Sequence, residues 1–184
     1  MKDMYNMAID ILTKAKVEGK AAFVGGGWVR DKLLGKDPKD LDIFVLNPYE
    51  EDMELVLNDY GDPVHYGGSG ENIREDVSHI EKYNDADVDI IYMKRHNIVQ
   101  VCNSFDTSIC QCYATLNDEG GLSYYTSIDF KDYSLKNIIW FYSDIQTTEG
   151  HIARIKEKFP NAEYKTKSTL GMFFSNTYSI HKMV

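Results

Sequence analysis

Two aspartates separated by one residue, Asp40 and Asp42, follow a short run of glycines. Alternate residues of a β-strand point to the same face of a sheet, so the two carboxylates converge if residues 39–46 form a strand. Paired carboxylate oxygens suit Mg²⁺, which takes one or two carboxylates together with waters and substrate phosphates. We therefore expect Asp40 and Asp42 to hold catalytic Mg²⁺, with Mn²⁺ as the alternative ion.

The glycine run at residues 25–27 stands immediately before a segment with helical spacing, residues 28–34. A glycine run alone is more often a tight turn. Before a helix, however, such a turn exposes backbone N–H groups and the positive end of the helix dipole, which together favour phosphate. A phosphate cradle beside a pair of metal-binding carboxylates indicates metal-assisted transfer from a nucleoside triphosphate.

This segment closely resembles the signature of class II tRNA nucleotidyltransferases and bacterial poly(A) polymerases, of the DNA polymerase beta-like nucleotidyltransferase superfamily. In that signature, Gly-Gly-x-Val-Arg-Asp-x-Leu-Leu-Gly precedes Asp-x-Asp. The residues of this chain in register are Gly26, Gly27, Val29, Arg30, Asp31, Leu33, Leu34, Gly35, Asp40 and Asp42. The resemblance implies that the aspartate pair binds catalytic metal and that Gly26, Gly27 and Arg30 bind the triphosphate. Asp31 belongs to the same nucleotide-binding set and is expected to support the turn.

The superfamily places a third carboxylate on a later strand. Asp89, flanked by apolar residues in 88–93, takes that position as a catalytic and metal-binding residue, and Asp87 is the rival. Asp106 falls in a diverged version of the element that joins head to neck in the family. It is expected to contact the nucleotide, with a helix N-cap as the alternative.

The fold expected from the resemblance is α+β: a polymerase-beta-like head over residues 1–130, with a small mixed sheet and flanking helices, and a helical neck-like segment over 131–184. The family's body and tail domains have no counterpart here. Hydrophobic spacing predicts the following elements: helices at 3–18, 28–34, 50–58, 106–116, 133–144 and 149–159; strands at 21–24, 39–46, 88–93 and 98–101; a long glycine-rich loop at 61–85; and a hairpin near 122–128.

The chain has 184 residues and a net charge of −9, which disfavours a general nucleic-acid coat. Residues 151–184 nevertheless carry six Lys and Arg against two Glu, and we expect this basic segment to face a polyanion. Three cysteines and no apolar run long enough for a membrane span favour a cytoplasmic protein without a membrane partner.

The expected reaction moves a nucleoside monophosphate from a triphosphate to an acceptor hydroxyl, foremost a tRNA-like RNA 3′ end. Two alternatives stay open: a minimal transferase that modifies a protein or a small molecule, and a catalytically idle nucleotide-binding module.

Overall fold

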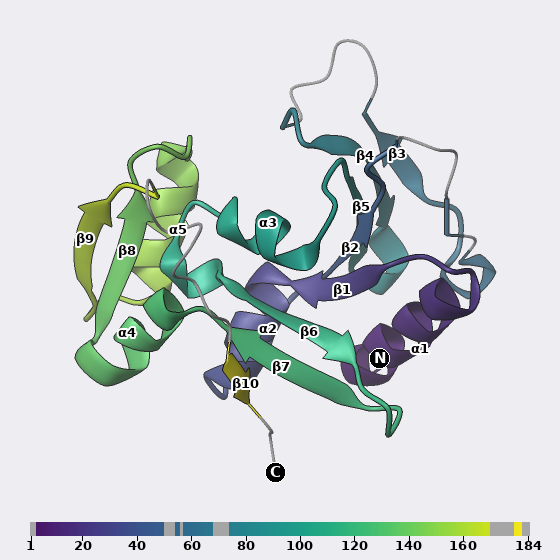
Figure 1. Ribbon diagram of the computed structural model, residues 1–184, viewed down its shortest axis with the longest axis horizontal. Coiled ribbons are helices and arrows are strands. Elements are labelled where there is room, and N and C mark those ends of the chain that lie inside the picture. Colours follow the sequence, from purple (N-terminus) through teal and green to yellow (C-terminus); the bar gives the residue numbers. More distant parts are fainter. Residues whose placement is uncertain (1–2, 50–53, 56, 68–73, 170–178, 182–184) are drawn as a thin grey trace.

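The computed structural model describes residues 3–49, 54–55, 57–67, 74–169 and 179–181. One large mixed sheet carries most of the strands (Figure 1). Its strand order is β10-β7-β6-β1-β2-β5-β4-β3. These strands are β1 (Ala22–Gly25), β2 (Leu41–Leu46), β3 (Val64–Tyr66), β4 (Val77–Tyr83), β5 (Val88–Met93), β6 (Cys112–Leu116), β7 (Leu122–Thr126) and β10 (Ser179–His181). Neighbours pair antiparallel, except that β2 and β5 run parallel.

Helices and short helical turns connect the strands. They are α1 (Met4–Val17), α2 (Gly26–Leu33), α3 (Ile98–Asn103), α4 (Ile128–Lys136) and α5 (Glu149–Lys158), with 3-10 turns η1 (Asn58–Tyr60), η2 (Asn84–Ala86) and η3 (Ser108–Cys110). A separate two-stranded parallel sheet pairs β8 (Ile138–Tyr142) with β9 (Glu163–Lys167). In Figure 1 this small sheet and α5 lie at the opposite side of the molecule from β3 and β4. None of the described helices is long and apolar enough to cross a membrane.

Apolar side chains cover both faces of the large sheet. The larger core contains α1 and α2 residues together with Leu41, Ile43 and Val45 from β2. The smaller core lies on the other face, where Phe44 and Leu46 meet side chains of α3. β2 is therefore buried on both faces, consistent with its nearly continuous apolar sequence, and Asp42 is its one polar residue.

The N-terminal predictions are confirmed, with shifts of one or two residues at the ends. α1 begins after Asp3, whose side chain accepts a hydrogen bond from the Tyr5 backbone N–H. β1, α2 and β2 follow in the expected order, and β5 also forms. The hairpin predicted near 122–128 is instead the single strand β7, which pairs with β6. The mixed α+β architecture is as expected.

Three other predicted elements are wrong. Residues 98–101 belong to α3 rather than to a strand, because Asn97 caps a helix by accepting the Gln100 N–H. Residues 112–116 form β6 rather than a helix, because they pair with β1 and β7 on both sides. The predicted loop 61–85 contains the whole of β3 and β4.

The C-terminal segment contains strands as well as helices, so the expectation of a purely helical neck is wrong. The helix predicted over 133–144 starts earlier, where the Ser127 hydroxyl accepts the Phe130 N–H. It ends at Asn137, whose left-handed backbone (φ 58°) turns the chain into β8. The helix predicted at 149–159 is confirmed as α5. In the predicted acidic helix at 50–58, residues 50–53 and 56 lie outside the described residues, and residues 54–55 and 57 are not helical.

Candidate active site

The large sheet brings Asp42 and Asp89 side by side. β2 and β5 are adjacent parallel strands, and their register places Asp42 opposite Asp89. Paired residues of neighbouring strands point to the same face, and neighbouring strands lie about 4.7–4.9 Å apart. Of the two candidates for the third carboxylate, Asp89 thus shares a sheet face with Asp42. Asp87 precedes β5 in a left-handed conformation and is exposed.

Asp40 lies immediately before β2 and is exposed, whereas the Asp42 side chain is largely shielded from water. Burial raises the pKa of Asp42 to about 7, and the negative charges of Asp40 and Asp89 add to this effect. Among the described residues, no side chain donates a hydrogen bond to the Asp42 carboxylate. A cation would relieve both the burial cost and the mutual repulsion, so this donor set fits a hard divalent ion.

Asp89 carries a contact that the sequence alone did not indicate. Lys82 of β4 lies opposite Asp89 in the sheet register, and its Nζ atom is 2.6 Å from Asp89 Oδ2. This ion pair raises the pKa of Lys82. Both residues lie on the same face of the sheet. Sequence analysis could have paired them only if the register between β4 and β5 had been known.

The glycine turn lies against the same carboxylates. Gly26 has a φ of 65°, a left-handed conformation that favours glycine, and it starts α2. A Cβ atom added there would lie 3.7 Å from Asp42 Oδ2, so the start of α2 and the Asp42 carboxylate are neighbours. Gly27 follows within the first turn of α2. The predicted phosphate cradle and the predicted metal ligands therefore meet at one place.

Arg30 and Asp31 are buried and bind one another. The Arg30 guanidinium donates to both Asp31 oxygens, at 2.8 and 3.1 Å, and Lys158 of α5 donates to Asp31 Oδ2. Burial of Asp31 opposes ionisation, but these two partners outweigh it and hold its pKa below the usual value. The expectation that Asp31 supports the turn fits this geometry. Arg30 remains close enough for its charge to act on Asp42.

Asp106 pairs with a histidine that the sequence analysis did not select. Its Oδ2 atom is 2.7 Å from Nδ1 of His151 on α5. The hydrogen bond to Asp106 raises the pKa of His151 to about 9, and in turn it lowers the pKa of Asp106 despite burial. Thr107, not Asp106, precedes the helical turn η3, so the alternative N-cap role for Asp106 is not seen.

Comparisons with known proteins bear on the fold. Residues 22–102 match the family described as the Poly A polymerase head domain. A comparison with curated protein sequences gives no match. Among solved structures, the fold is similar to the Thermotoga maritima CCA-adding enzyme complexed with tRNA (TM-score 0.61, 18% identity, 94% of this chain and 41% of that chain).

Two other similar structures are complexes with CTP. One is the Bacillus stearothermophilus CCA-adding enzyme (TM-score 0.52, 16% identity, 76% of this chain and 33% of that chain). The other is a further CCA-adding enzyme (TM-score 0.58, 15% identity, 94% of this chain and 42% of that chain). The chain therefore spans less than half the length of each of these three structures, and at these identities the likeness establishes the fold alone.

Proposed function

We propose that the protein is a metal-dependent nucleotidyltransferase, because residues 22–102 match the family described as the Poly A polymerase head domain. It transfers a nucleoside monophosphate from a nucleoside triphosphate to an acceptor hydroxyl and releases pyrophosphate. The observation that carries the proposal is the pairing of Asp42 with Asp89 beside the glycine turn. The low identity to solved structures leaves the nucleotide and the acceptor to be tested.

In this proposal, Asp40, Asp42 and Asp89 hold Mg²⁺ or Mn²⁺. The bound ion would neutralise phosphate charge and polarise the α-phosphate. The backbone N–H groups at Gly26 and Gly27 bind phosphate oxygens at the start of α2, where the helix dipole favours anions. These groups are held in place before the substrate arrives, and such preorganisation lowers the barrier without further rearrangement.

Arg30 contributes positive charge from α2, the helix that starts at the glycine turn. The Arg30 guanidinium is hydrogen-bonded to Asp31. Unless that pair opens, Arg30 therefore acts on the phosphates through its electrostatic field and not through direct hydrogen bonds. Asp89 is the candidate base for the acceptor hydroxyl, and Lys82 fixes its orientation. Asp106 extends the nucleotide site toward α5 through its pair with His151.

The acceptor proposed first is an RNA 3′ end. The fold is similar to that of enzymes solved with tRNA and with CTP, which supports RNA and nucleotide partners. The basic segment is less available than its sequence suggests. Lys158, Lys165 and Lys167 pair with acidic residues, Lys182 lies outside the described residues, and the exposed cations of α5 are Arg154 and Lys156.

Radiolabelled transfer tests the proposal. The protein is incubated with each α-labelled nucleoside triphosphate, Mg²⁺ or Mn²⁺, and tRNA-like RNA, and label on RNA, protein and small molecules is measured. We expect label on RNA, lost at least about 100-fold in Asp42→Asn and Asp89→Asn. Asp85→Asn is the matched control, because Asp85 is exposed on η2 near Asp89 in sequence. Label on protein or on a metabolite would mean that the acceptor is not RNA. Full activity in Asp42→Asn would contradict the proposed role of Asp42 as a metal ligand.

A second candidate function is nucleotide binding without transfer. The Lys82–Asp89 ion pair favours it, because an ammonium group already occupies the carboxylate that a cation would share with Asp42. Lys82→Met separates the two candidates. If the protein only binds nucleotide, the variant should still show no transfer. If the protein is an enzyme, the variant should change a transfer rate that the wild-type protein already has. Lys131→Met on α4 is the control.

A further inference from the structure

A second group of potential metal ligands lies on the other face of the large sheet. Glu54, His79 and Glu81 each offer one ligand atom, and these atoms all lie within 4.8 Å of one another. His79 and Glu81 occupy alternate positions of β4 opposite Tyr92 and Ile90, whose side chains belong to the larger core. Asp42, Asp89 and Lys82 face the other side, so the two sets of residues are separated by the sheet itself.

The buried member of this group is oriented by its surroundings. Glu81 is 2% exposed, and its Oε2 atom accepts a hydrogen bond from the Tyr92 hydroxyl at 3.0 Å. The same hydroxyl accepts the Leu55 backbone N–H at 2.6 Å, which fixes the residue next to Glu54. The His79 ring stacks on the Tyr92 ring at 4.1 Å. Tyr92 thus contacts Glu81 and His79 directly, and it contacts Leu55, the residue after Glu54. Residues that surround the ligands of metal sites orient them in this way.

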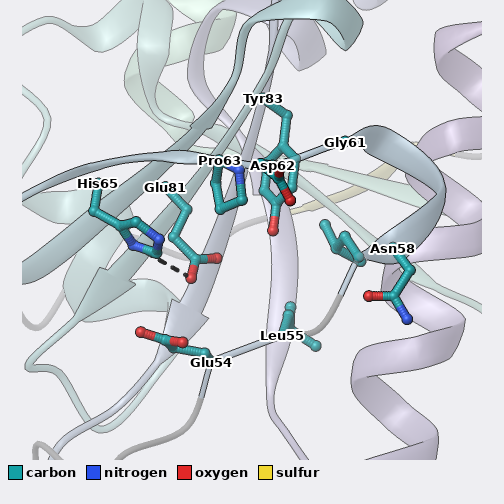
Figure 2. Close-up of a pocket in the computed structure, with 10 residues that line it drawn as sticks. Glu54, Leu55, Asn58, Gly61, Asp62, Pro63, His65, Glu81 and Tyr83 are labelled. Carbon is teal, nitrogen blue, oxygen red and sulfur yellow. Dashed lines mark ion pairs between the residues drawn. The ribbon is translucent and has the colours of Figure 1, made fainter.

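A cavity gives the group access to solvent. It has a volume of about 340 Å³, and its lining includes Glu54, His65 and Glu81. Figure 2 shows the Glu81 carboxylate facing the His65 ring, with the Glu54 carboxylate beside them. His65 Nδ1 is 3.9 Å from Glu81 Oε1, and its side chain is half exposed. It is therefore free to move toward the same centre as a fourth ligand.

The arrangement as it stands carries an electrostatic cost that a cation would remove. The carboxylate of the buried Glu81 lies within 4.8 Å of the Glu54 carboxylate, so two like charges stand side by side. Ligand atoms around a zinc ion stand about 3–4 Å apart, given metal–ligand bonds of about 2.0–2.2 Å. The present separations of up to 4.8 Å lie close to this range, and the Glu54 side chain is exposed.

We propose that Glu54, His79 and Glu81 bind a transition-metal dication, Zn²⁺ in the first instance, at a site independent of the nucleotide site. An imidazole ligand beside two carboxylates favours Zn²⁺, Mn²⁺ or Fe²⁺ over Mg²⁺ and Ca²⁺, which prefer oxygen ligands. The bound ion ties the chain around residues 54–65 to β4. His65 or water completes its coordination from the cavity.

Calorimetric titration of the full chain with Zn²⁺ tests this site. The chain carries Asp40→Asn and Asp42→Asn, so that the nucleotide site does not contribute, and metal is first removed with a chelator and dialysis. We expect one Zn²⁺ per chain, retained in excess Mg²⁺. Glu54→Gln and His79→Gln should each weaken binding at least about tenfold. Titration with Co²⁺ should give the visible absorption of a low-symmetry site with nitrogen coordination.

Glu119→Gln and His96→Gln are matched controls, because both residues are exposed outside the group. Absence of saturable Zn²⁺ binding, or equal affinity in Glu54→Gln and the controls, would overturn the proposal. Glu54 is exposed, so its substitution should leave the fold intact, which circular dichroism verifies. Because nucleotide transfer is not measured, failure of this site is distinct from failure of the proposed function.

Discussion

At the scale of single residues, the environment of Asp42 works against stability, as expected for a candidate metal ligand. It is a carboxylate placed on a strand that is otherwise apolar on both faces, beside two other negative charges. A fold selected only for stability would place an apolar residue there. The raised pKa of Asp42 means that the folded protein is penalised when this group ionises, and a bound cation or phosphate-bound metal offsets that penalty.

Asp42→Asn should therefore stabilise the metal-free protein while it removes transfer activity. The folded-state pKa is about 7 against an unfolded value of 3.8, so the penalty grows between these values and is complete above pH 7. We expect a gain of about 1–2 kcal/mol at pH 8 and almost none at pH 4, after discounting for partial solvent screening. Urea unfolding in a chelator at both pH values measures it. A loss of stability at pH 8 would contradict the environment described for Asp42.

At the scale of elements, the pair formed by Asp106 and His151 joins the segment just before η3 to α5. The folded pKa of His151 is about 9, above the unfolded value of 6.5, so the stabilisation is complete below pH 6.5 and is lost as the pH rises through 9. At low pH it is also lost once Asp106 protonates. We expect the pair to contribute about 2 kcal/mol near pH 6.

The pH dependence of His151→Gln checks this contribution. The difference in unfolding free energy between the wild-type protein and the variant should shrink from pH 6 to pH 10. His96→Gln serves as control, because His96 is exposed and lies outside this contact. A difference that stays constant over this range would mean that His151 is not held protonated by Asp106.

The elements also show which parts of the fold are readable from sequence. α1 and β2 carry clear periods of apolar residues, and each was predicted within two residues of its ends. The glycine turn and the aspartates Asp40 and Asp42 were found because they form a local sequence motif. α3 and β8 were missed because short apolar runs fit either a helix or a strand, and caps at Asn97 and Asn137 decided the outcome.

The partners of the site residues were missed for a different reason. Lys82, His151 and Lys158 reach Asp89, Asp106 and Asp31 from other elements. These contacts depend on strand register and on where α5 packs, neither of which is a local property of the sequence. Family resemblance supplied the acidic residues but not the cations that hold them.

At the scale of the whole molecule, Arg30, Asp31 and Lys158 connect α2 to α5. Asp31 is the centre, with two buried hydrogen bonds from Arg30 and one from Lys158. Asp31→Asn should cost about 3–5 kcal/mol, because it leaves the buried guanidinium without a carboxylate. Lys158→Met should cost only about 1 kcal/mol, because Asp31 keeps Arg30. Urea unfolding compares them, and equal losses would contradict the central place of Asp31.

The molecule is acidic overall, so any RNA must approach a restricted surface, and α5 offers the exposed cations Arg154 and Lys156. Each phosphate contact releases counterions, so removing two contacts lowers the salt dependence of binding. We expect the double variant Arg154→Ser with Lys156→Ser to reduce the slope of log affinity against log salt by about 1–2. Lys14→Ser with Lys16→Ser, on α1 at the far side of the molecule in Figure 1, should leave it unchanged. Fluorescence anisotropy with tRNA-like RNA measures both, and identical slopes would place the RNA surface elsewhere.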